Sequence, residues 1–144
     1  MEPRLTNITP GGEESIELPV FDHLHAGFPS PAGDYAGDRI DIVKEMVRHP
    51  NTTFYARISG DSMRDAGIFD GDIVVIDRSL EPHDGDYVVA FIDGEFTLKE
   101  YRTDAKNRCV WLMPHNKDFK PIRVEADDQF TVWGVMTHNI HPTR

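Results

Sequence analysis

The chain has 144 residues, which is enough for one domain with a substantial hydrophobic core and too few for two full domains. Its formal net charge is −10, from 15 lysine and arginine residues against 25 aspartate and glutamate residues, and this charge disfavours a surface that binds nucleic acid directly. The single cysteine, Cys109, excludes an intrachain disulfide and a cysteine-based metal site. Its apolar neighbours predict that it lies in the core.

No signal peptide opens the chain, and no apolar run of about 18 residues occurs in it. We therefore expect a cytoplasmic protein without a membrane segment. The same observation disfavours a membrane-anchored signal peptidase.

The first 14 residues are mostly polar, contain the turn-forming residues 10–12 and show no periodicity, so we expect them to be flexible. Residues 15–21 form a short, apolar strand candidate. Pro19 restricts this candidate to a sheet edge or to a docked extended segment.

Residues 26–31 place a bond between two small residues, Ala26 and Gly27, just ahead of two prolines. Small residues allow a peptide to enter a narrow active site, and the prolines keep the following segment extended. From these residues alone, an ordinary linker is the alternative. His23 and His25 lie nearby without a third ligand, so we predict neither a metal site nor another cofactor.

Residues 38–49 carry apolar side chains at helical spacing, with Asp38 as a possible N-cap and Pro50 as the stop. We predict a helix here that packs against the rest of the domain.

From Thr53 onward, β-branched and aromatic runs alternate with turns, which predicts a mainly β domain. We expect strands at residues 53–58, 72–77, 86–92, 95–101, 108–113, 121–124 and 130–138. Residues 114–118 are expected to form a turn, and His138 and His141 indicate no site.

Ser62 lies in the polar, glycine-containing turn between the first two of these strands. Gly60 allows the backbone to approach a bound chain, and amides at or beside Ser62 would point at a developing oxyanion. Serines in such segments most often only satisfy the backbone of the turn, and this alternative stays open.

Residues 86–101 are typical of a hairpin closed by a two-residue type I′ turn at Asp93 and Gly94. Such a turn pairs Val88 with Lys99, so that Lys99 shares a face with apolar side chains. Burial there disfavours the charged ammonium and lowers the pKa of a lysine, which allows it to act as a base. The alternative is a surface lysine at the edge of a hairpin.

Several separated motifs resemble the self-cleaving LexA/UmuD family, which uses a Ser–Lys dyad. They agree in residue type, order and spacing, and they are Ser59-Gly60-Asp61-Ser62-Met63, Gly67-Ile68 with Asp70-Gly71-Asp72, and Asp93-Gly94-Glu95-Phe96-Thr97 with Lys99. Residues 26–31, with Asp34-Tyr35 and Arg39-Ile40-Asp41, are similar to the cleavage-site region of the UmuD branch. The resemblance covers most of residues 16–141.

The resemblance implies a LexA- and signal-peptidase-like β domain of several mostly antiparallel strands, with one short helix and an extended N-terminal arm. Residues 1–38 would form the arm with the scissile bond Ala26-Gly27, and residues 39–144 the peptidase domain. Ser62 would be the nucleophile and Lys99 the general base.

The family further implies a role in the SOS response. It implies a homodimer, stimulation of cleavage by a RecA filament on single-stranded DNA and, after trimming, association with an error-prone Y-family DNA polymerase subunit of the UmuC type.

A repressor of the LexA type carries a DNA-reading domain before its cut site. Only 26 residues precede Gly27, so we expect no helix-turn-helix domain and no direct contact with nucleic acid. The alternatives are a dimeric adaptor without enzymatic activity, a fragment of a LexA-like repressor, and a peptidase that acts on other proteins.

Overall fold

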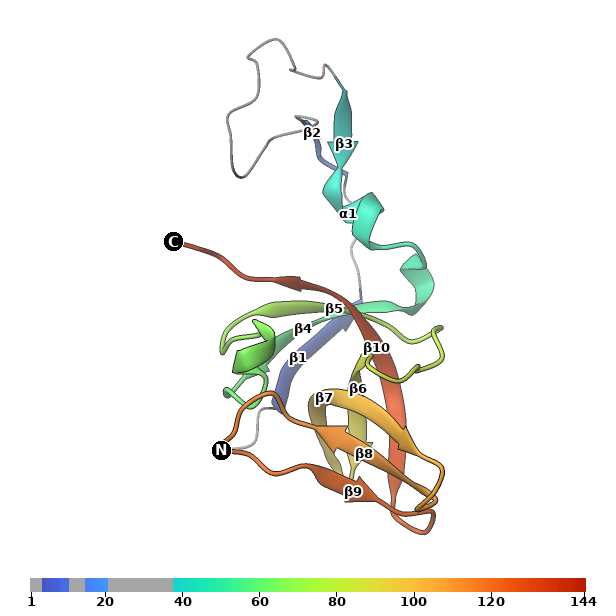
Figure 1. Cartoon of the computed structure of the whole chain (residues 1–144). Coiled ribbons are helices and arrows are strands. Elements are labelled where there is room, and N and C mark those ends of the chain that lie inside the picture. The colour runs from blue at the N-terminus through green and yellow to red at the C-terminus, as the bar shows by residue number, and fades with distance from the viewer. Residues whose placement is uncertain (1–3, 11–14, 21–37) are drawn as a thin grey trace.

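The computed structural model describes residues 4–10, 15–20 and 38–144. In these ranges an eight-stranded sheet forms the body, and a two-stranded sheet with a short helix extends away from it (Figure 1). The prediction of a mainly β fold with one short helix is therefore confirmed.

The large sheet has the strand order β1-β4-β5-β10-β6-β7-β8-β9, and every neighbouring pair is antiparallel. Its strands are β1 (Arg4–Pro10), β4 (Thr53–Ser59), β5 (Ile73–Asp77), β6 (Tyr87–Ile92), β7 (Glu95–Asp104), β8 (Cys109–Met113), β9 (Ile122–Val124) and β10 (Phe130–Ile140). All of the strands predicted from Thr53 onward are present.

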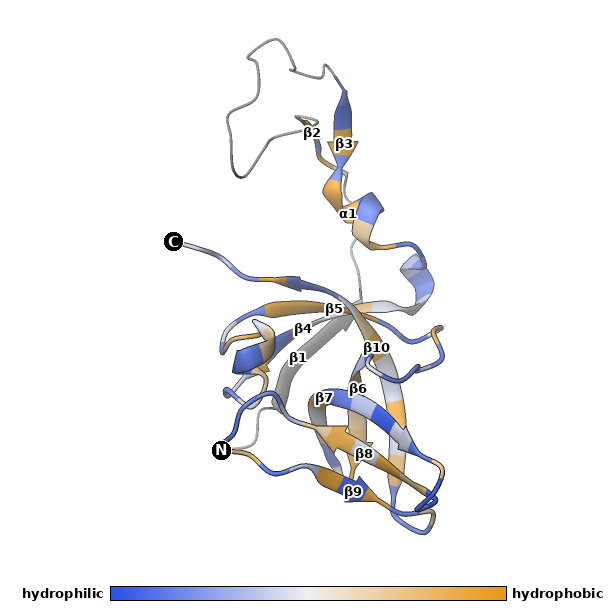
Figure 2. Ribbon diagram, viewed as in Figure 1, coloured by the Kyte–Doolittle hydropathy of each residue, from blue (hydrophilic) through white to orange (hydrophobic). Residues whose placement is uncertain are grey.

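Two groups of buried apolar side chains form the core. One contains Ala56, Ile58, Met63, Ile68, Val74, Ile76, Val89 and Leu98, and the other contains Val88, Ala90, Leu112, Val124 and Val135. Neighbouring residues of β6 belong to different groups, so this strand is buried on both faces. Figure 2 shows the apolar stretches along β5, β8 and β9.

The hairpin of β6 and β7 has the predicted register. Val88 pairs with Lys99, Ala90 with Thr97 and Ile92 with Glu95. Asp93 and Gly94 have φ angles of 50° and 82°, the two positive values that a type I′ turn requires. The local sequence of the turn thus sets which side chains of β7 face the core.

The prediction that the first residues are flexible is wrong for residues 4–10. They form β1, which pairs with β4 at one edge of the large sheet. Without β1, the backbone of β4 would present an unpaired edge, and pairing with another segment satisfies it. Backbone groups make this pairing, so the strand could not be predicted from a periodic pattern of side chains.

The helix predicted for residues 38–49 is wrong in extent. Residues Arg39–Asp41 instead form β3, which pairs with the short edge strand β2 (Glu17–Pro19) that the sequence predicted. The α-helix α1 covers only Ile42–Met46, and a 3-10 turn, η2 (Pro50–Thr52), follows it. The carboxylate of Asp41 caps α1 by accepting hydrogen bonds from two backbone amides. Because pairing with β2 holds these residues extended, the helix begins after Asp41.

The expectation that this helix packs against the body is also wrong. No residue of α1 is buried, and the side chain of Ile42 is 55% exposed. The helix lies with β2 and β3 in the part of the chain that extends away from the large sheet (Figure 1).

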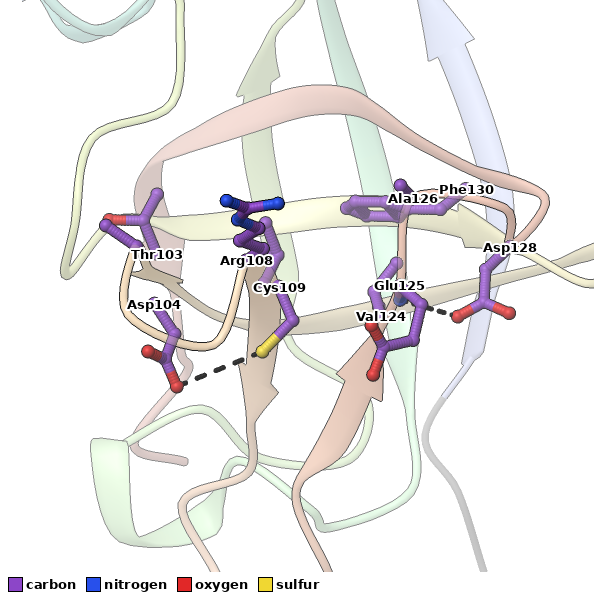
Figure 3. A pocket seen from close by; sticks show the side chains of 11 residues that line it. Thr103, Asp104, Arg108, Cys109, Val124, Glu125, Ala126, Asp128 and Phe130 are labelled. Carbon is purple, nitrogen blue, oxygen red and sulfur yellow. Dashed lines mark hydrogen bonds between the residues drawn. The ribbon is translucent and has the colours of Figure 1, made fainter.

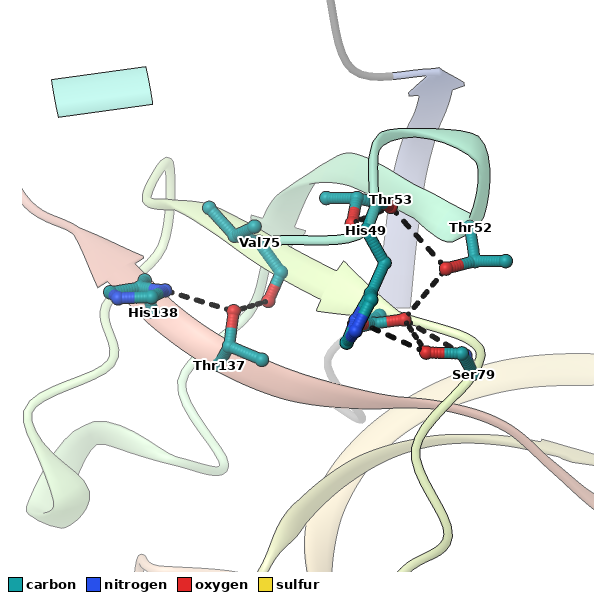
Figure 4. Close-up of polar contacts among 8 residues, drawn as sticks. His49, Thr52, Thr53, Val75, Ser79, Thr137 and His138 are labelled. Carbon is teal, nitrogen blue, oxygen red and sulfur yellow. Dashed lines mark hydrogen bonds and ion pairs between the residues drawn. The ribbon is translucent and has the colours of Figure 1, made fainter. Parts of the chain in front are cut away.

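A buried carboxylate joins this extension to the body. Asp77, the last residue of β5, is 4% exposed, and its Oδ2 lies 2.5 Å from Nδ1 of His49. Its Oδ1 accepts hydrogen bonds from Thr52 Oγ1 at 2.9 Å and from Ser79 Oγ at 2.7 Å (Figure 4). Burial alone would raise the pKa of Asp77, but the hydrogen bonds outweigh it and lower the pKa to about 2.

Replacing Asp77 by asparagine should lower the free energy of unfolding by about 2 kcal/mol near neutral pH. The folded pKa of about 2 lies below the ordinary value of 3.8, so the stabilisation by the carboxylate is complete above pH 4 to 5 and is lost as the pH falls toward 2. Urea unfolding at pH 5 and at pH 2.5 should show a difference between wild type and Asp77→Asn that narrows at the lower pH. The exposed control Asp127→Asn should change little at either pH. An equal difference at both pH values would contradict this account of Asp77.

Candidate active site

The turn after β4 carries Ser62. The chain leaves β4 at Ser59 and reverses at Gly60, whose φ of 99° is readily adopted only by glycine. The amide of Gly60 donates to Asp70 Oδ1 at 2.7 Å, and a 3-10 turn, η3 (Arg64–Ala66), follows Ser62. The backbone of the turn is therefore held by groups other than the Ser62 hydroxyl.

The Ser62 side chain is completely buried, and within the described ranges its hydroxyl has no hydrogen-bond partner. A buried hydroxyl without a partner costs free energy, and such groups are few in native proteins. The ordinary structural role of a turn serine, to satisfy the backbone with its hydroxyl, does not apply to Ser62.

Lys99 is also completely buried, in the middle of β7. Its Nζ donates hydrogen bonds to Thr97 Oγ1 at 2.6 Å and to the carbonyl oxygen of Leu98 at 3.3 Å. Lysine is rarely found fully buried, and removal from water disfavours its charged form. The alternative of a surface lysine at a hairpin edge is therefore wrong.

The turn that carries Ser62 and the strand that carries Lys99 are neighbours, and His115 contacts both. The amide of His115 donates to the carbonyl oxygen of Ser62 at 2.7 Å. Its Nε2 lies 2.9 Å from Oε1 of Glu100, the residue after Lys99. The structure thus brings the two predicted residues into one region, although the Ser62 hydroxyl is not hydrogen-bonded to the Lys99 amine.

Glu100 is a buried carboxylate beside this region. Its two oxygens contact Nε of Arg102 and Nε2 of His115. Burial raises the pKa of Glu100, but the hydrogen bonds from Arg102 and His115 outweigh it, so the pKa lies below its ordinary value. Glu100 is accordingly ionised and paired at neutral pH, and its lowered pKa makes it a weak base.

The contacts that Thr97 and residues 114–118 make around Ser62 and Lys99 were not predicted from the sequence. The register of the hairpin contained a signal for Thr97, because residues two apart on a strand share a face and Thr97 lies two before Lys99. Residues 114–118 were expected only to form a turn. Their hydrogen bonds to the Ser62 turn join segments about 50 residues apart, and no local pattern announces such contacts.

Ser62 and Lys99 do not line either of two cavities that the described part of the chain forms in its body. One, of about 450 Å³, lies beside Asp77 and His138, and the other, of about 380 Å³, lies beside Asp104 and Cys109 (Figure 3). Cys109 is buried, as predicted, and burial raises the pKa of its thiol. The thiol therefore stays protonated and is a poor nucleophile.

The predicted scissile bond between Ala26 and Gly27 lies outside the described residues, as do His23 and His25. Within the described ranges, no group of three histidine, cysteine or acidic side chains is arranged to hold a metal ion. The helices in these ranges are all too short or too polar to cross a membrane.

Known proteins are similar to this chain over most of its length. Residues 19–137 match the family described as Peptidase S24-like. Protein ImpA of Salmonella typhimurium is 43% identical over 136 residues, which cover 94% of this chain and 91% of that protein. Protein MucA of Escherichia coli is 43% identical over 136 residues, covering 92% and 91%. The LexA repressor of Xylella fastidiosa is 39% identical over 132 residues, covering 92% of this chain and 61% of the repressor.

The family match includes the Ser62 turn and the β6–β7 hairpin with Lys99, and the relatives extend it to nearly the whole chain. The resemblance inferred from the separated motifs is thereby confirmed, and the chain belongs to the Peptidase S24-like family.

Proposed function

We propose that this protein is a self-cleaving serine peptidase of the SOS response, which cuts its own Ala26-Gly27 bond with Ser62 as nucleophile and Lys99 as general base. The observation that carries this proposal is the complete burial of Lys99, hydrogen-bonded to Thr97, beside a turn whose serine hydroxyl is buried and unpartnered in the described part of the chain. A lysine serves as a base only when it is neutral, and burial favours the neutral form.

In the proposed reaction, the neutral Lys99 amine takes the proton of Ser62 Oγ while the oxygen attacks the carbonyl carbon of Ala26. Amides at or beside Ser62 stabilise the resulting oxyanion. The C–N bond then breaks, and Lys99 returns the proton to the leaving amine of Gly27. Water, deprotonated by Lys99, releases the acyl group and restores Ser62. The hydroxyl oxygen of Thr97 accepts a hydrogen bond from the Lys99 amine and so fixes the orientation of the amine.

The substrate segment belongs to the same protein, so its effective concentration at the dyad is high without tight binding. The position of the arm then controls the rate. We propose that a RecA filament on single-stranded DNA favours the arrangement in which the arm is cut. The net charge of −10 fits a protein that responds to DNA through another protein and not by direct contact.

Cleavage after Ala26 would remove β2 and leave β3 and α1 on the trimmed protein. A cavity of about 360 Å³ lies between these elements, and Ile16 and Leu18 from the removed side line it together with Ile40, Ile42 and Val43. Removal of β2 would therefore expose both apolar side chains and the edge of β3 that now pairs with β2. Exposed apolar patches and strand edges are typical of protein contacts.

We therefore propose that the trimmed protein, as a homodimer in the cytoplasm, uses this surface when it joins an error-prone Y-family DNA polymerase subunit of the UmuC type. A dimeric adaptor without enzymatic activity is the alternative. An adaptor has no need for a completely buried lysine or for an unpartnered buried serine, and both cost free energy.

Self-cleavage should disappear in both Ser62→Ala and Lys99→Arg. The first variant lacks the nucleophile, and the second keeps the charge but cannot be deprotonated, so each should lower the rate by at least about 100-fold. Intact-mass measurement of purified protein at pH 7 to 10, with and without RecA and single-stranded DNA, follows the reaction. The wild type and the exposed control Lys106→Arg should both yield a body that begins at Gly27.

Three results would contradict parts of this proposal. Cleavage of Ser62→Ala at the wild-type rate would assign the reaction to another residue or protease. Substantial cleavage of Lys99→Arg would show that the charge of Lys99 matters and not its basicity. A product that begins at a residue other than Gly27 would show that Ala26-Gly27 is not the scissile bond.

A further inference from the structure

Three hydrogen bonds tie the Ser62 turn to the loop that follows β8. The amide of His115 donates to the Ser62 carbonyl at 2.7 Å, and the amide of Asp65 donates to the His115 carbonyl at 2.7 Å. The side-chain Nδ2 of Asn116 donates to the carbonyl of Asp61 at 2.9 Å. All three contacts reach the turn within three residues of the proposed nucleophile.

Asn116 is 4% exposed, and both ends of its side-chain amide are used. Besides the bond from Nδ2, its Oδ1 accepts from the backbone amide of Asp118 at 3.0 Å. A buried side chain with both groups satisfied fixes its own loop and the segment that it reaches. Aspartate has nearly the same shape but lacks the Nδ2 donor.

The same loop is tied to the strand that carries Lys99. The His115 ring contacts the Glu100 carboxylate through Nε2 and packs edge-on against Tyr87, with ring centroids 5.5 Å apart. Arg102 holds the other oxygen of Glu100. Residues 114–118 therefore contact the two elements that supply the proposed dyad.

We propose that Asn116 is a positioning residue which, together with His115, sets the separation of Ser62 and Lys99. This inference rests on the proposed function of the dyad. Because the Ser62 hydroxyl has no partner in the described ranges, its position depends on the backbone of its turn, and loop 114–118 holds that backbone. Misplacement of a reacting group by about 1 Å can lower a rate about 100-fold.

The test measures the rate at which a fluorophosphonate labels Ser62, together with self-cleavage, in Asn116→Asp. Labelling needs a positioned and activated serine but not a docked arm. Both rates should fall by about 10-fold or more at temperatures where circular dichroism shows the variant folded. The matched control is Asn107→Asp in the β7–β8 turn, where Asn107 Nδ2 donates to Asp104 at 2.8 Å, and it should label within about twofold of wild type.

Labelling of folded Asn116→Asp at the wild-type rate would overturn the proposal, since a role in stability alone does not change the reactivity of the folded protein. Should Asn116→Asp not fold, His115→Ala takes its place, because it keeps the backbone bonds and removes the contacts of the ring with Glu100 and Tyr87. Wild-type labelling of that variant would also overturn the proposal. Absence of labelling both in the wild type and in a folded variant that lacks residues 1–10 would instead count against the dyad itself.

A separate observation concerns β1. This strand pairs with β4, with Arg4 opposite Ser59 and Leu5 opposite Ile58, and it also contacts β7 (Figure 1). β4 leads directly into the Ser62 turn, and β7 carries Lys99. The backbone of β1 therefore lies against both elements that supply the dyad.

Ser62 and Lys99 are both completely buried in this arrangement, whereas a scissile carbonyl must come within about 3.5 Å of the nucleophile. Extended peptides are commonly bound by pairing with the edge of a strand. The edge of β4 next to Ser62 is taken by β1. On the basis of the proposed function, we infer that β1 blocks the place where the segment to be cut binds, and that β1 must leave before cleavage.

Deletion of residues 1–10 should therefore accelerate Ser62-dependent self-cleavage by about threefold or more. A synthetic peptide of residues 4–10, added in excess to the deletion variant, should slow cleavage again, and a peptide of the same composition in scrambled order should not. An unchanged or lower rate in a folded deletion variant would overturn the inference.

If the deletion variant does not fold, the full chain with Leu5→Pro and Ile8→Pro replaces it, because proline removes backbone donors from β1. This variant too should cleave itself faster than the wild type, and an unchanged or lower rate would overturn the inference. A wild-type protein that never cleaves in any condition would refute the proposed function and not the role of β1.

Discussion

The amine of Lys99, completely buried inside the large sheet, is the feature on which the rest of the site depends. The type I′ turn at Asp93 and Gly94 fixes the register of β6 and β7 and so directs Lys99 toward the apolar side chains of Val88 and Ala90. The amine donates hydrogen bonds to the hydroxyl of Thr97 and to the backbone carbonyl of Leu98. Such surroundings favour a neutral amine, which is the state that a general base needs.

The polar group that stabilises the fold and the polar group proposed to carry out the chemistry are different ones. The carboxylate of Asp77 is charged, fully hydrogen-bonded and placed where the N-terminal extension joins the body, so it stabilises the fold. The hydroxyl of Ser62 is buried without a partner in the described part of the chain, so its surroundings cost stability. Buried polar groups left unsatisfied in this way are typical of sites kept for function.

The sequence predicts most of the body and the burial of Lys99, one of the two residues of the proposed dyad, because their signals are local. Alternating apolar residues mark the strands, and the Asp-Gly turn sets the register that buries Lys99. The strand β1 and the loop around Asn116 could not be predicted, since backbone pairing and contacts between distant segments leave no periodic pattern. The helix was predicted too long because pairing of residues Arg39–Asp41 with β2 overrides their helical spacing.

The most direct test of the central claim is a nuclear magnetic resonance titration of the Lys99 side chain in folded Ser62→Ala protein, with the signal assigned by comparison with Lys99→Arg. Lysine in water titrates near pH 10.4. Complete burial predicts a midpoint below that value, with the neutral amine populated as the pH rises. A midpoint at or above 10.4 would show that Lys99 is held as an ammonium and would contradict its proposed role as the base.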